Sequence, residues 1–378
     1  MRIAIDGHTI GNKRSGDETY TIGLIKALAD IDKTNEYIVY VTNDSAYKLI
    51  GKLPDNFVIK KICPHNRWIR LCVSYPLAFL KDRPDIIHFQ YIAPIFNSAK
   101  LVLTIHDVSY RLLPEQYSFI ERLSLVYGTA LMMKVAKKVL TVSQVSKEQI
   151  ADNFHIDRDK ITVVYNGVPE HFKTKVSEDE EKKILKKYEI KRNYFLYVGN
   201  LKPRKKVDEL LKGYAELVTK KNIEYDLVIV GRKTDMFEEL FSMAEELQIS
   251  KRVKFLGYVD DMSLSVLYKR AKLFVYPSVF EGFGLPLVEA MIKGVPVICY
   301  NGSSTAEVCR DAALKLDEIT SKSLADAMGN LMDNEEKRSE LIERGYVRAK
   351  EFTWEKSAVK TLEVYREVYT ELASKKKD

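Results

Sequence analysis

The chain has 378 residues, 46% of them hydrophobic and 30% charged, which is long enough for two domains with separate cores. A net charge of +7 is compatible with nucleic acid, anionic lipid or an anionic substrate, but scattered solvated lysines explain it equally well. Four cysteines without CxxC spacing indicate neither a disulfide framework nor a zinc site, as in a reducing compartment. The first six residues resemble a buried strand rather than a signal peptide, and no apolar run approaches the roughly 20 residues of a membrane helix.

The first half of the chain alternates apolar runs with helical segments. A strand is predicted over residues 2–6, followed by a glycine-bearing loop over 7–16 and an amphipathic helix over about 19–31. Further strands are predicted over residues 37–42, 57–62, 86–89, 101–105, 138–142 and 161–165. The pattern predicts a doubly wound α/β domain ending near Pro169. The charged stretch 173–187 beyond it is typical of a linker with a short helix.

The second half of the chain repeats this alternation. Its strands are predicted over residues 195–198, 227–230, 253–255, 273–276, 295–300 and 313–316. Residues 324–372 show a strong 3.6-residue period of apolar side chains and are predicted to be helical. The sequence therefore predicts a second α/β domain.

Two residues of the first domain are candidate site residues because of where they stand. His106 directly follows a very apolar predicted strand, and α/β sheets bind ligands at the carboxyl ends of their strands. Gly16 precedes the first helix and would let the backbone approach a ligand, although an ordinary loop glycine is an equal alternative. Asp157 and Asp159 form a DxD pattern that we interpret as a turn. The remaining histidines are interpreted as structural: His8, His65, His88, His155 and His171.

The segment over residues 66–81, NRWIRLCVSYPLAFLK, mixes basic residues, Trp68 and apolar side chains. This mixture is typical of a helix that lies in a membrane interface, which would make peripheral membrane association part of the function. It equally suits a helix buried in the first domain, and we favour that interpretation.

A charged loop follows the first strand of the second domain. Its residues are Gly199, Asn200, Leu201, Lys202, Pro203, Arg204, Lys205 and Lys206. Four cations at the carboxyl end of a strand stand where α/β sheets bind ligands. Arg204 and Lys205 together would neutralise a diphosphate without a metal. Taken alone, the loop is explained better as a solvent-facing connection.

A strand, a glycine loop and a helix follow one another over residues 272–296. The N-terminus of the helix leaves free N–H groups and positive dipole facing the loop, so an anion is expected there. Glu281 in the loop and Glu289 on the helix frame that position, and their acceptor oxygens suit the hydroxyls of a sugar attached to the anion.

The glycines of this loop begin like a dinucleotide fingerprint, but the pattern breaks at Leu287, where the third glycine belongs. No acidic residue ends the next strand, so a nicotinamide cofactor is not indicated. For the glycines alone, or for the glutamates alone, a tight turn with solvated carboxylates is about an equally good explanation. Two such loops at the same edge of one sheet favour a ligand site.

These segments together resemble a known family. FVYPSVFEGFGLPLVEAMIKGVPVI contains the EX7E pair, Glu281 and Glu289, of retaining GT-B glycosyltransferases of glycosyltransferase family 4. Within the family the chain is most similar to bacterial mannosyltransferase-like members that build cell-surface polysaccharide. The resemblance covers nearly the whole chain and includes YVGNLKPRKKVDELL, VKFLGYVDD, SSTAEVCRDAAL, TVSQVSKEQI, VVYNGV and TIHDVSYRLLPEQYS.

The resemblance implies a GT-B fold, with two Rossmann-like doubly wound α/β domains facing across a cleft. The N-terminal domain, residues 1–172, would bind the acceptor, and a linker over 173–190 would follow it. The C-terminal domain, residues 191–353, would bind the sugar nucleotide. The terminal helix, within 354–378, would cross back to the first domain.

The resemblance also implies roles for single residues. Arg204 and Lys205 would bind the diphosphate of the donor, Glu281 would meet the transferred sugar, and Glu289 would hold the ribose. His106 would face the transferred sugar. The remaining donor-binding candidates are Gly16, Gly199, Phe283, Gly284 and Leu285.

The sequence departs from the family pattern at three places. Lys206 stands where asparagine is common, and Ala306 replaces a frequent proline. The segment SGDETY differs from the glycine-rich form of many relatives, so the acceptor side is matched least well.

The resemblance implies a retaining, metal-independent hexosyltransferase without a cofactor. Its donor would be GDP-mannose or a UDP-sugar, and its acceptor a saccharide or lipid-linked saccharide at the cytoplasmic face of the cell membrane. A sugar-nucleotide epimerase and a non-catalytic sugar-nucleotide-binding protein of the same fold are the alternatives. A nucleic-acid partner is not indicated, because the basic residues are spread along the chain and no recognition module is visible.

Overall fold

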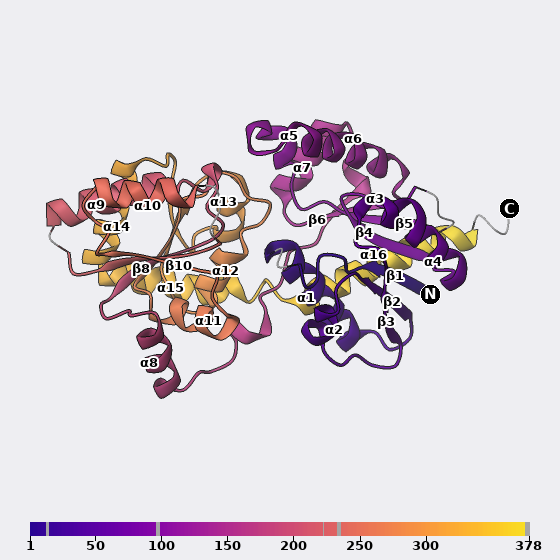
Figure 1. Cartoon of the computed structure of the whole chain (residues 1–378), viewed down its shortest axis with the longest axis horizontal. Helices are drawn as coiled ribbons and strands as arrows, with labels where there is room; N and C mark the ends of the chain where they lie inside the picture. The colour runs from indigo at the N-terminus through magenta and orange to yellow at the C-terminus, as the bar shows by residue number, and fades with distance from the viewer. Residues whose placement is uncertain (13–14, 96–98, 222, 233–235, 375–378) are drawn as a thin grey trace. The chain divides into compact units, whose positions relative to one another are not determined.

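The computed structural model describes residues 1–12, 15–95, 99–221, 223–232 and 236–374. Its internal contacts divide the chain into two compact units. The first unit contains Met1–Gly167 together with Thr353–Asp378, and the second contains Val168–Phe352. Each unit holds one parallel sheet with helices on both of its faces (Figure 1).

The sheet of the first unit has seven parallel strands in the order β3-β2-β1-β4-β5-β6-β7. Strand order reverses between β1 and β4, so the loops that follow these two strands diverge at the carboxyl edge of the sheet. The strands are β1 Arg2–Asp6, β2 Glu36–Val41, β3 Phe57–Lys61, β4 Ile86–Gln90, β5 Lys100–Thr104, β6 Lys138–Thr141 and β7 Ile161–Val163.

Strand β4 is buried at every residue and β1 and β5 at all but their first, as the continuous apolar runs in the sequence predict for a parallel sheet covered on both faces. One core cluster joins α1, α2 and α16 to one face, and a second joins α4, α6 and α7 to the other. The helices are α1 Ser15–Ile31, α2 Ser45–Ile50, α3 Arg67–Ile69, α4 Tyr75–Asp82, α5 Ser109–Leu112, α6 Phe119–Val135, α7 Gln144–Phe154 and α16 Trp354–Ser374, with short turns η1 Arg70–Ser74, η2 Pro114–Gln116 and η3 Arg158–Lys160.

Helix α16, from the end of the chain, packs beside α1 from its beginning (Figure 1). A glycine permits this close approach, because a Cβ at Gly23 would lie 2.2 Å from the indole ring of Trp354. A buried polar contact adds to it, since the Tyr365 hydroxyl lies 2.5 Å from Nδ1 of His88 on β4. Both ring nitrogens of His88 have partners, since its Nε2 lies 2.6 Å from Oγ1 of Thr104.

The segment over residues 66–81 forms α3, η1 and α4 and is only partly buried, whereas the sequence analysis favours a buried helix. Tyr75 and Phe79 are buried against the sheet. Trp68, Leu77 and Leu80 are 59%, 61% and 73% exposed. The helix is therefore half-buried, with an apolar outer side.

The sheet of the second unit has six parallel strands in the order β10-β9-β8-β11-β12-β13. Its strand order reverses between β8 and β11, which pair directly. The strands are β8 Tyr194–Val198, β9 Asp226–Val230, β10 Val253–Gly257, β11 Leu273–Tyr276, β12 Val297–Tyr300 and β13 Leu314–Leu316.

The helices of the second unit also cover both faces of its sheet (Figure 1). The first of them, α8, belongs to this unit through an ionic contact. Its Glu181 is buried and pairs with Arg270 of α11 at 2.9 Å. The helices are α8 Glu178–Lys187, α9 Val207–Lys221, α10 Phe237–Glu246, α11 Asp261–Arg270, α12 Leu285–Ile292, α13 Ser303–Cys309, α14 Ser321–Asp333 and α15 Glu335–Ala349, with short turns η4 Glu170–Phe172 and η5 Pro203–Lys205.

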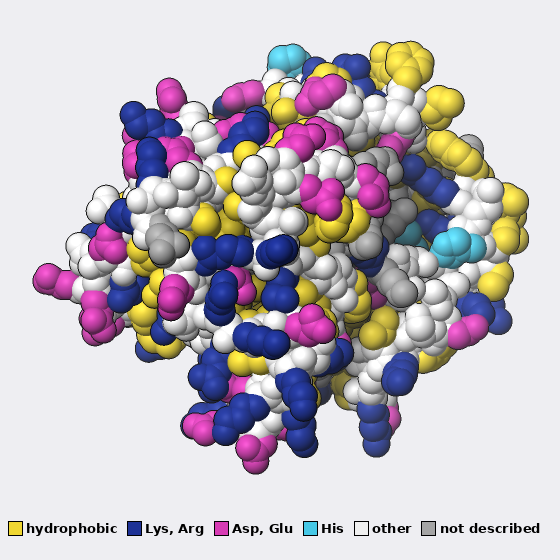
Figure 2. All heavy atoms as spheres, turned by 60° about the vertical axis from the view of Figure 1, so that its left-hand side comes forward, with side chains coloured by type: hydrophobic (Ala, Val, Ile, Leu, Met, Phe, Trp, Pro, Cys, Tyr) yellow, Lys and Arg dark blue, Asp and Glu magenta, His cyan; other side chains and the backbone are white. Residues whose placement is uncertain are grey.

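Two surface properties bear on possible partners. Lys and Arg side chains are interspersed with Asp and Glu over the face shown in Figure 2, as expected for solvated surface charge. Among the described helices, none has both the length and the apolar character needed to cross a bilayer.

Candidate active site

The two loops that stand out in the sequence of the second domain meet at the reversal point of its sheet. One loop follows β8 and contains η5, and the other follows β11 over residues 277–284. The backbone joins them, because the N–H of Val279 donates to the carbonyl of Arg204 at 3.0 Å. At the start of the first loop, the N–H of Gly199 donates to the carbonyl of Val230 at 2.9 Å. Open α/β sheets bind ligands at this position.

Lys205 and Glu281, one from each loop, form a buried ion pair. Lys205 Nζ donates to Glu281 Oε1 and also to the hydroxyl of Tyr276, at 2.9 Å. That hydroxyl in turn donates to the same carboxylate oxygen at 2.7 Å. Burial acts to raise the pKa of Glu281, but the positive charges of Lys205 and Arg204 outweigh it and hold the pKa below its ordinary value. Glu281 is therefore ionised at neutral pH.

Arg204 lies beside this ion pair and is partly exposed. Its Nε donates to the carbonyl of Phe280 at 3.3 Å, which holds the guanidinium at the second loop. A planar guanidinium offers further donors in a fork that matches phosphate oxygens. Lys205 and Glu281 neutralise each other, so Arg204 gives this position a net positive charge.

Helix α12 begins directly after the second loop. Gly284 is its N-cap residue, with φ of +94°, a left-handed conformation that side-chain-bearing residues rarely adopt. Leu285 is the first residue of the helix, and Phe283 is buried with its ring edge-on to Phe352, 5.4 Å between centroids. Pro286 has no N–H, and the N–H of Leu287 donates to the carbonyl of Gly284 at 3.0 Å, so this end favours an anion mainly through the positive end of the helix dipole.

Glu289 lies one turn into α12 and is buried. The hydroxyl of Tyr268 on α11 donates to its Oε2 at 2.9 Å. Burial raises the pKa of Glu289 to about 7, although the hydrogen bond from Tyr268 opposes the shift. Buried carboxyl groups with strongly shifted pKa values cluster at functional sites, which makes Glu289 a candidate site residue.

The two candidates of the first unit lie at the carboxyl edge of its own sheet. His106 follows β5, and its Nε2 lies 2.8 Å from Oε1 of Gln90 and 3.9 Å from Oδ1 of Asp17. Burial lowers the pKa of His106, and the carboxylates of Asp17 and Asp107 offset only part of this. Gly16 is next to Asp17 in the first turn of α1, so the helix starts earlier than the sequence predicts.

Two protein-family models match the chain, one over each half. A family model described as "Glycosyl transferases group 1" matches residues 177–348, which include both loops and α12. A second, described as "Glycosyltransferase Family 4", matches residues 14–172. The chain belongs to glycosyltransferase family 4.

Relatives of this glycosyltransferase include O-antigen enzymes. The chain is 28% identical to the O-antigen chain mannosyltransferase B of Escherichia coli, over 97% of this chain and 100% of the relative. It is 33% identical to the O-antigen chain mannosyltransferase RfbU of Salmonella typhimurium, over 61% of this chain and 60% of that one. The glycosyltransferase is thus distantly similar to bacterial O-antigen mannosyltransferases.

Solved structures establish the fold of the glycosyltransferase. The Anabaena protein Alr3699/HepE, solved in complex with UDP and glucose, superimposes with a TM-score of 0.77 at 20% identity, over 97% of this chain and all of the other. Such a likeness shows the fold. Together with the two parallel sheets, it confirms the predicted GT-B class of two Rossmann-like doubly wound domains.

Of the ten candidate site residues of the glycosyltransferase, the structure brings eight together around the reversal point of the second sheet. The other two, His106 and Gly16, lie in the first unit. Sequence analysis missed the tyrosines that join this cluster, Tyr276 and Tyr268. Tyr276 carries a weak signal as the last residue of a strand before a loop, whereas Tyr268 lies within an ordinary helix. Gln90, the partner of His106, was also missed.

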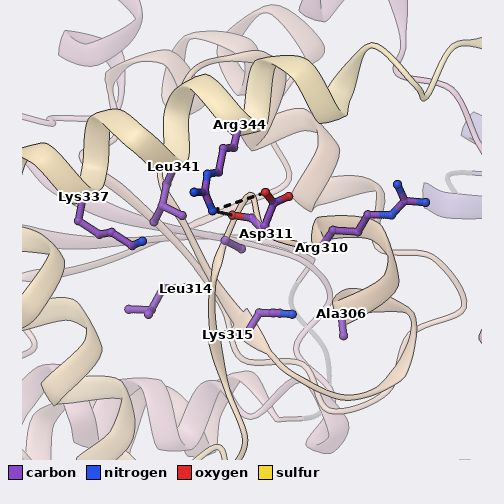
Figure 3. Close-up of a pocket in the computed structure, with 9 residues that line it drawn as sticks. Ala306, Arg310, Asp311, Leu314, Lys315, Lys337, Leu341 and Arg344 are labelled. Carbon is purple, nitrogen blue, oxygen red and sulfur yellow. Dashed lines mark hydrogen bonds and ion pairs between the residues drawn. The ribbon is translucent and has the colours of Figure 1, made fainter.

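A separate pocket of about 580 Å³ lies at the free edge of the second sheet, beside β13 (Figure 3). Arg310 and Asp311 come from the turn after α13, and Lys337 and Arg344 project from α15. Within the pocket Arg344 pairs with Asp311 at 3.5 Å. None of the candidate site residues lines this pocket. Among the described residues, no group of three or more His, Cys, Asp or Glu side chains is arranged to hold a metal ion.

Proposed function

We propose that this glycosyltransferase is a retaining hexosyltransferase that transfers mannose from a nucleoside-diphosphate sugar. GDP-mannose is the first candidate donor, and UDP-sugars are the next. The acceptor would be a saccharide or lipid-linked saccharide of a cell-surface polysaccharide such as lipopolysaccharide. The mannosyltransferase names of the relatives support the choice of sugar. The buried pair of Lys205 and Glu281 beside Arg204 is the observation that carries the proposal.

The donor would bind through its charged centre. Arg204 and the N-terminus of α12 would hold the diphosphate, because the guanidinium presents N–H donors and the helix end presents positive potential at the same end of the sheet. Lys205 would add an ammonium group fixed by Glu281 and Tyr276. Glu289, once ionised, would accept hydrogen bonds from the ribose hydroxyls.

The transfer step needs charge stabilisation on the leaving group. The bond between the anomeric carbon and the diphosphate oxygen breaks, and its electron pair stays on the nucleoside diphosphate. The acceptor oxygen bonds to the same face of the sugar, and its proton passes to the departing phosphate oxygen. Fixed cations lower the barrier because negative charge grows on the leaving diphosphate while the sugar gains positive charge. In this scheme protein groups supply the positive charge, so a chelator should leave turnover unchanged.

The carboxylate of Glu281 is suited to stabilise the positive charge that develops on the sugar. It is ionised, buried and oriented by two hydrogen bonds to one oxygen. Its second oxygen would accept from a hydroxyl of the transferred sugar while its charge favours the positive sugar ring. His106, neutral at physiological pH, would meet the sugar from the first unit.

The experiment is a turnover assay on the purified chain with GDP-mannose, UDP-glucose and UDP-galactose. Release of nucleoside diphosphate that depends on a saccharide or lipid-linked acceptor is expected, fastest with GDP-mannose. Proton NMR of the product should show the anomeric configuration of the donor. An altered sugar still attached to nucleotide would indicate an epimerase. Binding of the donor without any turnover would indicate a sugar-nucleotide-binding protein.

A further inference from the structure

Two helical segments of the first unit carry an unusual amount of exposed apolar surface. Nearly half of the large hydrophobic side chains that are exposed in the described residues belong to these two segments. On α3, η1 and α4 they are Trp68, Ile69, Val73, Leu77 and Leu80. On α6 they are Phe119, Ile120, Leu123, Tyr127, Leu131 and Val135. We call these eleven residues the apolar outer surface.

The apolar outer surface follows from the sequence of the helices. On α6 the exposed positions recur every four residues, so they form a stripe along a helix of 17 residues. The buried positions Thr129, Met132 and Met133 lie on its inner side. Both segments use their inner sides to cover the same face of the seven-stranded sheet. Folding of the first unit therefore does not require their outer sides to be apolar.

Both segments also begin at the same edge of the sheet. A helix that connects parallel strands starts where the preceding strand ends, so α3 and the N-terminus of α6 lie toward the carboxyl edge. His106 lies at this edge, and only α5 and η2 separate it from α6 along the chain. Ile120, at the beginning of α6, is 80% exposed.

The charges around the apolar outer surface are mostly positive. Of the charged residues that are not buried, residues 67–83 contain three Arg or Lys and no acid, and residues 111–137 contain four Arg or Lys and two Glu. Arg67 lies over the ring of Trp68, 5.6 Å from its centroid. Exposed aromatic and aliphatic side chains with a basic rim suit the interface of an anionic lipid bilayer.

We propose that the apolar outer surface docks on an anionic lipid bilayer. Aliphatic and aromatic side chains enter the headgroup region, and Arg and Lys side chains at the rim contact lipid phosphates. The buried side of α4 then packs in the core, and its exposed apolar side contacts the membrane. The docking does not depend on the transfer reaction, so it can fail while the proposed function holds.

The test is flotation of the whole chain with vesicles of phosphatidylcholine, with and without about 30% phosphatidylglycerol. Binding to the anionic vesicles that weakens at high salt is expected. The double variant Leu80→Glu with Ile120→Glu should weaken it about tenfold or more, because charges replace two largely exposed apolar side chains. Val347→Glu, at an exposed valine of the second unit, is the matched control and should bind like the parent.

Tryptophan fluorescence gives a second measurement on the same samples. The chain has two tryptophans, and Trp354 is buried in the core while Trp68 belongs to the apolar outer surface. A blue shift on adding anionic vesicles, abolished by Trp68→Phe, is expected. Absence of flotation, or flotation that the double variant does not reduce, would overturn the proposal. A dimer in sedimentation experiments that the double variant dissociates would instead assign this surface to a second copy of the chain.

A different observation supports a second inference, about the proton on His106. The hydroxyl of Thr21 has one hydrogen, which it donates to the carbonyl of Asp17 at 2.7 Å. It therefore accepts from Nε2 of Gln90, which lies 2.7 Å away. This fixes the side-chain amide of Gln90 with its oxygen toward Nε2 of His106, at 2.8 Å.

We infer that Gln90 and Thr21 hold the neutral imidazole of His106 in the tautomer with its proton on Nε2. Nδ1 is then the acceptor that remains for a hydroxyl group. The charged and titratable groups around the ring agree with this, since Asp17 lies on the Nε2 side, 3.9 Å away, and Asp107, His88, Tyr20 and Tyr91 complete its surroundings. Gln90 and Thr21 are positioning residues. A role for this tautomer in transfer rests on the proposed function, but the tautomer itself does not.

Nitrogen-15 NMR of the histidine side chains tests this tautomer without any activity measurement. The His106 signals, assigned with His106→Ala, should show a protonated Nε2 and a free Nδ1 near neutral pH. Thr21→Val removes the acceptor for Gln90 and should shift the population toward protonated Nδ1, whereas Thr21→Ser keeps the hydroxyl and the original tautomer. A parent protein with protonated Nδ1, or Thr21→Val spectra identical to those of the parent, would overturn the inference.

Discussion

Lys205 and Glu281 are buried together across two loops, and each compensates the charge of the other. The pair therefore has a structural role as well as the proposed role at the donor. Removing one partner leaves an uncompensated charge in a buried position, which typically costs about 3–5 kcal/mol. Removing both leaves no charge to bury.

We predict opposite outcomes for stability and activity at this pair. Lys205→Met should lower the free energy of unfolding by about 3 kcal/mol, and the double variant with Glu281→Gln should recover most of that loss. Activity should not recover, and kcat/KM of both should fall by about 100-fold or more, because the fixed ammonium group is gone. Urea unfolding and donor turnover of the three proteins measure this. Near-normal turnover of the double variant would refute the role of Lys205 in transfer.

Glu289 should make stability fall as pH rises. Its pKa is about 7 in the folded chain against the ordinary 4.5, so between these pH values the folded state binds a proton that the unfolded state has lost. The free energy of unfolding therefore declines through this window. Glu289→Gln cannot ionise and should become more stable than the parent above pH 7, by up to about 3 kcal/mol. Denaturation at pH 5 and pH 8 tests this, and equal pH slopes for the two proteins would contradict it.

Lys206 has a backbone φ of +53°, in the left-handed region. The family resemblance implies asparagine as the common residue here, and asparagine tolerates this conformation better than lysine. Lys206→Asn should therefore raise the free energy of unfolding by about 0.5 kcal/mol. Lys202→Asn, which makes the same change where φ is −126°, is the control and should bring no gain. A melting temperature that falls for Lys206→Asn would contradict the prediction.

Among the described residues, none gives a steric reason for a glycine at position 16. A Cβ there would meet no atom of that part of the chain within 4 Å, and the residue lies in the first turn of α1. Gly16→Ala should keep or raise the melting temperature, since alanine favours helix. If Gly16 contacts the donor as the family resemblance implies, donor turnover should fall in the same variant. Unchanged turnover would remove Gly16 from the site.

Much of the fold follows from local sequence signals. The apolar run 273–276 is confirmed as β11, and the other predicted strands are found within a few residues. The strand predicted over 295–300 begins at Val297, because the N–H of Val295 is used to close α12. The helical stretch 324–372 divides into three helices. Asn334 separates the first two, because it ends α14 and caps α15 through the N–H of Lys337.

The sequence predicts most of the individual site residues, but it does not predict which of their side chains contact one another. The cations of residues 202–206 and Glu281 stand beside strand ends, so sheet topology alone places them at one edge. Their mutual compensation depends on the side chains of two loops 76 residues apart. The contacts of Tyr268 with Glu289 and of Gln90 with His106 join different elements, and no spacing in the sequence indicates them.

The most direct test of the central claim is calorimetric titration of the chain with GDP and with UDP. The account predicts one saturable site per chain for a nucleoside diphosphate, and Arg204→Ala should weaken its binding about tenfold or more. Arg310→Ala, which removes an exposed cation of the separate pocket, should bind like the parent. Absence of binding, or equal loss of affinity in the two variants, would contradict a donor site at the loops after β8 and β11.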